Sequence, residues 1–499
     1  MVPDAARGRG GIRGVLSVAC ALAVLAAVRA PAAALPTRPL SGAAIHRITA
    51  HPQGMYLDIE RRTFEYFWQT TDPQTGLAPD RWPTSAPSSI AATGFALTAE
   101  VIGAARGYVS RRAAAERVRT TLAFLLSLPQ GPQRTGEAGY HGFFYHFLNL
   151  HTGLRAPRSE LSTIDTALLM AGVLTAEGYF DKPTPLERQV RTLARQLYLR
   201  VDWRWAEPGG DPRVSVAWFP TTGFAHLRWA GYNEASLLYI LGMGSPTHPL
   251  RAGAWRAWTS TYGSDWRHLD GQTMLAFGPQ FGHQYTAVWI DLRGIADKFM
   301  RAHGETYFGN ARRATLAQRQ YAIRDPLGWD GYGPDIWGLT TCDGPGDVQA
   351  PFRHSLRRFY SYVARGIAPP YVDDGTLAPT AVVGSLPFDP RIVTLATTAL
   401  LRKYGTLIYT HYGFLDAFNP SFTDAALARH GHVAPGLGWV DGNYLGIDQG
   451  PILAMIANER GGLIWRILRH NPYIRRGLRR AGFQGGWLHS PAGRSSRAR

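Results

Sequence analysis

The chain has 499 residues, of which 45% are hydrophobic and 18% charged, so it can bury a large core, and disorder over most of its length is excluded. Of its formal charge of +17, +3 lies in residues 1–34 and +9 in residues 466–499, which leaves +5 for the body between them. A nucleic-acid-binding protein would concentrate basic residues on its folded body, so this distribution argues against that class.

The first 34 residues have the pattern of a secretory signal peptide. Three arginines precede an apolar segment, residues 15–28, which is too short for a settled membrane span, and alanines at 32–34 offer a cleavage site. We therefore expect a periplasmic or secreted protein whose mature chain has no membrane span. Cys342 would then be its only cysteine, which excludes an internal disulfide.

Beyond the signal, residues 35–54 include Pro36 and Pro39 and show no hydrophobic period, which predicts a linker. Helical spacing of apolar residues begins at Tyr56. Further helices are predicted at 90–105, 110–128, 163–176, 186–200, 234–242, 249–260, 283–300, 307–322, 390–404, 448–458 and 463–470. Long alternating β-branched runs are almost absent, so the chain is predicted to be all-α.

The predicted helices alternate between two kinds. Residues 163–176 are apolar on every face, as in a helix surrounded by protein, whereas residues 186–200 carry a single apolar stripe. This alternation predicts a toroid of helical hairpins, with an inner ring of helices wrapped by an outer one. We assign it to residues 55–485, followed by a basic disordered tail at 486–499, and expect the long Gly- and aromatic-rich loops to form a cleft at one rim.

Two apolar helices carry acids where they begin. Ser162 and Asp165 have the spacing of a capping box, and Glu160 lies just before them. Asn233 is expected to cap the second helix, with Glu234 in its first turn. Acids at the mouths of buried helices suit a glycan-cleaving barrel, in which two carboxyl groups flank the bond that is broken.

Ordered motifs along nearly the whole mature chain, from about residue 55 to 483, resemble the bacterial glycoamylase-like domain family. They include Phe64–Trp68, Ser89–Phe95, Gly142–Phe147, Glu160–Asp165, Gly244–Pro249, Trp337–Leu339, Tyr412–Asn419 and Gln449–Pro451. That family includes the inverting endo-β-1,2-glucanases of glycoside hydrolase family 144, whose fold is a toroid of six helical hairpins, (α/α)6.

The resemblance implies hydrolysis of β-1,2-linked glucan or of a related bacterial glycan. The sequence departs from the family pattern at two places: Asn233 precedes Glu234 where an aspartate is expected, and Cys342 precedes Asp343 where a serine is expected. The first departure removes a charge beside a candidate catalytic acid, so the activity could differ from that of the family's known enzymes.

Inversion requires one protonated carboxyl group and one carboxylate about 6.5–9.5 Å apart. Glu234, Glu160 and Asp165 are the predicted catalytic residues, and Glu234 is the preferred general acid because desolvation among aromatic residues would raise its pKa. A structural capping role is about equally compatible with Glu234 and Asp165. Asp343 or Asp448 could replace either as the base.

Other polar residues lie in Gly- or aromatic-rich segments, where their side chains could bind sugar hydroxyls or simply form buried hydrogen bonds. The predicted substrate-binding residues are Arg81, His146, Tyr232, His283, Gln284, Tyr285, Asp291, Asp343 and Asp448. Neither a metal nor another cofactor is predicted, because the histidines lack metal-ligand spacing and Asp373-Asp374-Gly375 lacks the rest of an EF-hand loop.

Three functions therefore remain open. The first is a monomeric hydrolase of neutral β-glucan, whose partner is an oligo- or polysaccharide. The second is a lyase acting on an acidic glycan, for which Tyr145, His146, Tyr285 and Arg293 could supply the base and the carboxylate-neutralising group. The third is a noncatalytic glycan-binding protein of the cell envelope.

Overall fold

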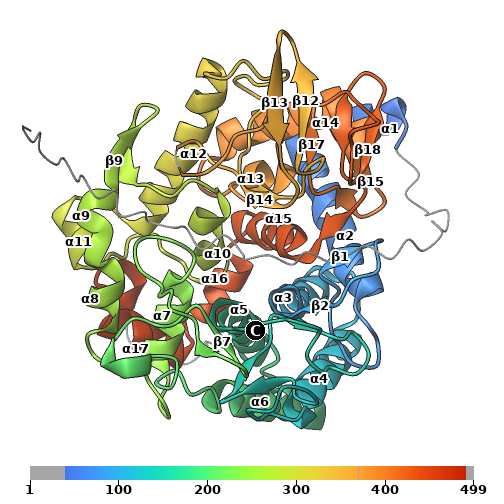
Figure 1. Ribbon diagram of the computed structural model, residues 1–499. Helices are drawn as coiled ribbons and strands as arrows, with labels where there is room; N and C mark the ends of the chain where they lie inside the picture. Colours follow the sequence, from blue (N-terminus) through green and yellow to red (C-terminus); the bar gives the residue numbers. More distant parts are fainter. Residues whose placement is uncertain (1–39, 369, 490–499) are drawn as a thin grey trace, which may run out of the picture.

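The computed structural model describes residues 40–368 and 370–489. The predicted signal peptide, residues 1–34, and residues 490–499 of the predicted tail lie outside the described residues. Among those described, helices form two concentric layers, which confirms the predicted toroid (Figure 1).

Six helices around the middle form the inner ring. They are α3 (Ile90–Arg106), α5 (Thr163–Tyr179), α7 (Ser236–Gly244), α10 (Phe281–Trp289), α13 (Pro379–Val383) and α15 (Gly446–Glu459). The ring closes because α3 packs against both α5 and α15. Of the other inner helices, α7 contacts both α5 and α10, and α13 contacts α15. Their side chains are almost all buried, as expected for helices without a charged face.

Six longer or amphipathic helices form the outer layer. They are α2 (Pro52–Thr70), α4 (Arg111–Ser127), α6 (Pro185–Leu199), α12 (Tyr307–Arg324), α14 (Pro390–Ile408) and α17 (Pro472–Arg480). The helices α2 and α4 pack on α3, α6 on α5, α17 on α7, α12 on α10 and α14 on α13. The remaining helices are α1 (Gly42–Ile48), α8 (Ala254–Trp258), α9 (Tyr262–Asp265), α11 (Lys298–Ala302) and α16 (Leu463–Leu468), with 3₁₀ turns η1 (Pro208–Gly210), η2 (Thr259–Thr261) and η3 (Gly486–Leu488).

Glycines allow the closest approach within the inner ring, between α3 and α5. A Cβ atom added to Gly172 would lie 2.1 Å from the carbonyl oxygen of Gly94, and one added to Gly94 would lie 2.5 Å from the carbonyl oxygen of Leu168. These neighbours are backbone atoms, which cannot move aside as a flexible side chain can. The contact therefore admits no larger residue without separating the two helices.

Gly172→Ala is expected to lower the free energy of unfolding by about 3 kcal/mol, the upper part of the usual cost of overpacking. Gly54→Ala is the matched control, because nothing lies within 4 Å of the added methyl group in helix α2. That change should stabilise the protein by about 0.5 kcal/mol, since alanine loses less conformational freedom than glycine in a helix. Urea unfolding of both variants measures the two effects, and equal stabilities would contradict the packing argument.

The two ends of the toroid differ. At the end where the inner helices finish, α16 packs against α5, α10 and α15, and the indole Nε1 of its buried Trp465 donates to the carbonyl of Ala287 at 2.7 Å. At the other end the inner helices begin, and their first residues are joined to loops and short strands. This second end, which we call the rim, carries most of the predicted site residues.

Short strands, in sheets of two or three, organise the loops. They are β1 (Arg81–Trp82), β2 (Ser88–Ser89), β3 (Gly139–Tyr140), β4 (Phe143–Phe144), β5 (Phe147–Leu148), β6 (Leu161–Ser162), β7 (Ala217–Phe219), β8 (Gly223–Phe224), β9 (Trp266–Leu269), β10 (Gln272–Leu275), β11 (Thr341–Cys342), β12 (Val348–Phe352), β13 (Ser355–Phe359), β14 (Val363–Ala364), β15 (Tyr409–Thr410), β16 (Gly413–Phe414), β17 (Phe418–Asn419), β18 (His432–Ala434), β19 (Gly438–Val440) and β20 (Tyr444–Leu445). All named pairs are antiparallel, including β1 with β20 and β2 with β5, which join segments far apart in the chain.

The structure corrects several predicted boundaries. The segment predicted as a linker contains α1, whose buried Ile45 reaches Gly405 of α14, and α2 already begins at Pro52. The helix predicted at 283–300 is divided into α10 and α11, and the one predicted at 249–260 is reduced to α8 and η2. Part of the predicted tail is ordered on the domain, because Trp487 Nε1 donates to the carbonyl of Asp291 at 2.8 Å.

Candidate functional site

The first group of predicted residues lies where α5 begins. Ser162 is the N-cap, and its Oγ accepts from the backbone N–H of Asp165 at 3.2 Å, as in a capping box, while the Asp165 carboxylate accepts from the Ser162 hydroxyl and not from its backbone N–H. His146 lies between the two predicted acids: Nδ1 is 2.8 Å from Glu160 Oε1, and Nε2 is 3.7 Å from Asp165 Oδ2. The structure therefore brings Glu160, Asp165 and His146 together.

The electrostatics of this group follow from its burial. Desolvation alone would lower the pKa of His146, but the neighbouring carboxylates of Asp165 and Glu160 raise it to about 9. Burial raises the pKa of Asp165, and this effect is opposed by His146 and by the hydrogen bond from Ser162. At neutral pH His146 is therefore an imidazolium, and it lies between the two acids.

Glu234 lies just before α7, not within it. The prediction that Asn233 caps this helix is wrong, because α7 begins at Ser236 and Asn233 Oδ1 instead accepts from the N–H of Ala235 at 3.0 Å in the preceding turn. An asparagine can bond to nearby backbone in this way as readily as it can cap a helix, and the sequence does not distinguish the two.

The side chain of Glu234 is buried, and one of its carboxyl oxygens is unsatisfied. Glu234 is 5% exposed, and its Oε2 has no hydrogen-bond partner among the described residues. Burial raises the pKa of Glu234 to about 8, and the negative charge of Asp165 adds to the shift. Glu234 is therefore mostly protonated at neutral pH and lies close enough to the first group to be influenced by it.

A cavity of about 110 Å³ opens beside Glu234. Its lining includes Trp229, Tyr232, Phe277 and Tyr371, aromatic residues of the kind that pack against sugar rings. Tyr232 is held in place by His283: Tyr232 Oη is 3.1 Å from Nδ1, and Nε2 is 3.2 Å from the Phe277 carbonyl, so Nε2 carries the proton and Nδ1 accepts. Burial lowers the pKa of His283 to about 4, which keeps this arrangement neutral.

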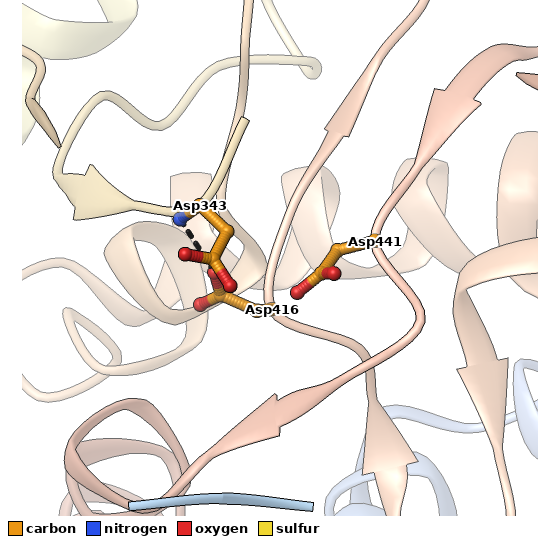
Figure 2. A group of neighbouring side chains, drawn as sticks. All are labelled: Asp343, Asp416 and Asp441. Atoms are coloured by element: carbon orange, nitrogen blue, oxygen red, sulfur yellow. Dashed lines mark hydrogen bonds between the residues drawn. The ribbon is translucent and has the colours of Figure 1, made fainter. Parts of the chain in front are cut away.

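A second group of acids lies at the start of α15, where Asp343, Asp416 and Asp441 point toward one another (Figure 2). One carboxylate oxygen from each lies within 4.8 Å of the others. The backbone N–H of Asp343 donates to Asp416 Oδ2 at 2.8 Å, and Arg81 Nη1 donates to Asp343 Oδ2 at 2.6 Å. Carboxylates at this spacing could also hold a divalent cation, although Arg81 occupies an Asp343 oxygen that such an ion would use.

Asp448 completes this second group and differs from its neighbours in its pKa. Burial, together with the neighbouring carboxylates, raises the pKa of Asp416 and of Asp441 well above the usual range. Burial also raises the pKa of Asp448, but a hydrogen bond with Asp416 opposes the shift, and the value is about 7. Oxygens of Asp416, Asp441 and Asp448 lack partners among the described residues, so the group presents unsatisfied acceptors.

Backbone contacts place both groups on one rim. Asp80 is next to Arg81, its carbonyl accepts from the N–H of Gly446 at 2.8 Å, and its charge influences the pKa values of both His146 and Asp448. On the other side, Thr286 Oγ1 donates to the carbonyl of Glu234 at 3.3 Å, and Tyr285 Oη donates to the carbonyl of Ile447 at 3.1 Å. The middle of α10 therefore contacts the backbone both at Glu234 and next to Asp448.

Two predicted residues are directed elsewhere. Gln284 is fully buried between α10 and α13, where Nε2 donates to the carbonyls of Thr380 and Ala381. Asp291 lies beyond the opposite end of α10, where its carboxylate pairs with Arg293 and Arg469. The structure thus gives both residues structural partners instead of a place in the cleft.

Two residues of the second group were not predicted as site residues. Neither Asp416 nor Asp441 lies at the start of a helix. Each lies in a loop between two short strands. The only signal in the sequence is their position in Gly- and aromatic-rich segments, Tyr412–Asn419 and Gly438–Tyr444, which many other acids share.

Comparison with known proteins relates this rim to carbohydrate enzymes. A family model described as "Putative glucoamylase" matches residues 226–472. A solved structure from Bacteroides uniformis with the same description is 30% identical, with a TM-score of 0.74, and the match covers 88% of this chain and 99% of that one. The endo-β-1,2-glucanase of Chitinophaga pinensis, solved with sophorotriose and glucose, is 27% identical with a TM-score of 0.74, covering 90% and 100% of the two chains.

A curated relative is also named for the β-1,2 linkage. The exo-β-1,2-glucooligosaccharide sophorohydrolase (non-reducing end) of Parabacteroides distasonis is 26% identical over 455 residues, which are 85% of this chain. The match spans only 57% of that enzyme's length.

Proposed function

The chain belongs to the glycoamylase-like family, and from that premise we propose that it is a glycoside hydrolase which cleaves β-1,2-linked glucan at the rim. The observation that carries the proposal is the pair Glu234 and Asp448. Both carboxyl groups are buried, both have an oxygen without a partner among the described residues, and the backbone at or next to each acid accepts a hydrogen bond from the middle of α10. The activities of the relatives support the β-1,2 linkage.

Glu234 is the proposed general acid. Its pKa of about 8 keeps the carboxyl group protonated at neutral pH, as protonation of a leaving oxygen requires. The adjoining cavity with Trp229 and Tyr232 would receive a sugar ring next to the bond that is cleaved. Glu234 was also the acid preferred from the sequence, because desolvation among aromatic residues was expected to raise its pKa; the helix in which it was placed begins two residues later.

The proposed base is Asp448 and not Glu160 or Asp165, the two candidates first predicted. Glu160 and Asp165 are both engaged by protein partners, since each carboxylate lies against the His146 imidazole and that of Asp165 also accepts from Ser162. Asp448, with a pKa of about 7, is ionised in part at neutral pH and remains a good base. We assign Glu160, His146 and Asp165 to substrate binding and to the electrostatic field around Glu234.

In the proposed reaction Asp448 takes a proton from a water molecule while that water attacks the anomeric carbon. Glu234 gives its proton to the glycosidic oxygen as the carbon–oxygen bond breaks. Inversion requires room for this water between the acid and the base, and inverting enzymes keep the two carboxyl groups about 6.5–9.5 Å apart. Asp416 and Asp441 each have an oxygen without a partner among the described residues, which can form a hydrogen bond with a sugar hydroxyl.

The alternative of a lyase is disfavoured by where its candidate groups lie. Tyr145 is fully buried, and Tyr285 Oη donates to a backbone carbonyl. Arg293 pairs with Asp291 at the opposite end of the toroid, away from the rim. A lyase would need these groups at a uronate, and the rim presents mainly acids, which would repel one.

The function is tested by incubating the protein with linear β-1,2-, β-1,3- and β-1,4-glucans and measuring the reducing ends released. We expect products from the β-1,2-glucan alone, and nuclear magnetic resonance taken early in the reaction should show the α-anomer at the new reducing end. A β-anomer would contradict inversion, an unsaturated product absorbing in the ultraviolet would establish a lyase, and tight binding without product would establish a binding protein.

We also propose that the protein is exported and acts as a monomer in the periplasm or outside the cell, on the basis of the sequence of residues 1–34. In the part of the chain that the structure describes, no helix is both long enough and apolar enough to cross a bilayer.

A further inference from the structure

We propose that the outer face of helix α17 docks this protein on a membrane surface that contains anionic phospholipid. The docking face consists of the exposed Arg476, Arg479 and Arg480, which with Pro472 and the buried Arg475 line a surface pocket of about 330 Å³. We call these five residues the α17 patch. The proposal concerns a surface remote from the rim and is independent of the proposed hydrolase activity.

The packing of α17 fixes which way these arginines point. Ile474 and Leu478 are buried, and a Cβ atom added to Gly477 would lie 1.9 Å from the carbonyl oxygen of Ile240 in α7. So close a contact between the helix backbones holds α17 in one rotation. Arg476, Arg479 and Arg480 are consequently exposed on the opposite side, at the i, i+3 and i+4 spacing that places them next to one another.

Hydrogen bonds to backbone carbonyls hold the exposed guanidinium groups in place. Arg476 Nη1 donates to Gly244 at 3.4 Å and Arg480 Nη1 to Met243 at 3.0 Å, both at the end of α7. Arg479 Nη2 donates to Leu488 at 3.3 Å. A guanidinium has five N–H groups, so each of these bonds leaves most of its donors for a ligand.

No acid offsets this concentration of charge along the local sequence. Residues 460–489 contain seven arginines and neither aspartate nor glutamate. The pKa of Arg475 is lowered by burial and further by the charge of Arg479, one helical turn away. Like charges at this spacing destabilise a helix, so folding alone does not account for them.

Phosphate is an anion that such a surface fits, because the planar guanidinium binds its oxygens in pairs, as it also binds those of a carboxylate. Clusters of four or more basic residues on an amphipathic helix are typical of binding to anionic lipid headgroups. The patch also lies at the end of α7 remote from Glu234, so a docked protein would keep its rim open to a soluble glycan. These observations favour a lipid surface over an acidic polysaccharide, which would be expected at the cleft.

The test compares three forms of the full chain in co-sedimentation with vesicles of phosphatidylcholine alone or with added phosphatidylglycerol. Arg476→Gln/Arg479→Gln/Arg480→Gln removes three charges from the patch. Arg112→Gln/Arg188→Gln/Arg391→Gln removes three exposed charges from α4, α6 and α14 and is the matched control. We expect the first variant to bind anionic vesicles at least about tenfold more weakly than the wild type, and the control to differ by less than about twofold.

A charge-preserving variant and added salt separate a loss of charge from a loss of folding. Arg476→Lys/Arg479→Lys/Arg480→Lys keeps the charge and should retain most of the binding even if the glutamine variant fails to fold, and about 0.5 M salt should release the wild type. Equal binding to neutral vesicles, equal losses in the patch and control variants, or displacement by inorganic phosphate at low millimolar concentration would each overturn the proposal. Tighter binding to soluble polygalacturonate than to vesicles would assign the patch to an acidic polysaccharide instead.

Discussion

Replacing Glu234 with glutamine is expected to lower kcat on β-1,2-glucan by about 100- to 10,000-fold, the usual contribution of general acid–base catalysis. Glutamine has the same shape but no proton to give to the leaving oxygen. Affinity for a β-1,2-linked oligosaccharide should stay within about tenfold of the wild type, since ground-state contacts are preserved. Initial rates and isothermal titration calorimetry measure the two quantities separately.

The leaving group provides a sharper criterion for the role of Glu234. An aryl β-sophoroside with a strongly acidic phenol leaves without protonation, so Glu234→Gln should retain much of the wild-type rate on that substrate. Glu100→Gln is the matched control, because Glu100 is also buried, its pKa is also raised to about 8 by burial, and it lies in the second half of α3, away from the rim. Turnover by that variant should change by less than about twofold. Full turnover of β-1,2-glucan by Glu234→Gln would reject the assignment.

Asp448→Asn is expected to abolish turnover, with a loss in kcat of about 1,000-fold or more on glucan and aryl substrates alike. The base is needed whatever the leaving group, which distinguishes its loss from that of the acid. Asp165→Asn and Glu160→Gln serve as comparisons, because these were the bases first predicted from the sequence. Either change would disturb His146 and substrate binding, but a greater loss of kcat there than in Asp448→Asn would reassign the base.

The same assignment fixes the pH dependence of kcat/KM. Asp448 must be ionised, so the rate should fall as the pH drops below about 7. Glu234 must be protonated, so the rate should also fall as the pH rises above about 8, which leaves a narrow optimum between the two values. With an aryl substrate, Glu234→Gln should lose the alkaline decline and keep the acidic one.

Much of the toroid could be predicted from the sequence because its helices carry strong local signals. Ser110 and Ser162 cap the helices that they were expected to cap, and the apolar stretch after Ser162 forms a buried inner helix. The predictions failed where tertiary contacts decide the structure. The helix expected across Asp291 is interrupted because the chain there turns to pair with Arg293 and Arg469, and α17 depends on its contact with α7.

The candidate site, too, could be predicted where local sequence signals mark it and not where tertiary contacts form it. Glu160, Asp165 and Glu234 could be found because each lies next to the start of an apolar helix. The group around Asp448 could not be assembled, because Asp343, Asp416 and Asp441 come from separate loops and meet only when α15 closes the ring. Their raised pKa values, too, are properties of burial in the folded protein and not of the residues alone.

The closing of the ring by α15 against α2 and α3 has a consequence for biogenesis. Helix α3, the first of the inner ring, packs against α15, which begins only at Gly446. The toroid therefore cannot be completed before the ribosome has made residues 446–459. Contacts between such distant segments make folding slow. A nascent chain that cannot finish folding early can still pass through a translocation channel in an unfolded state. This property suits the export that we propose for the protein.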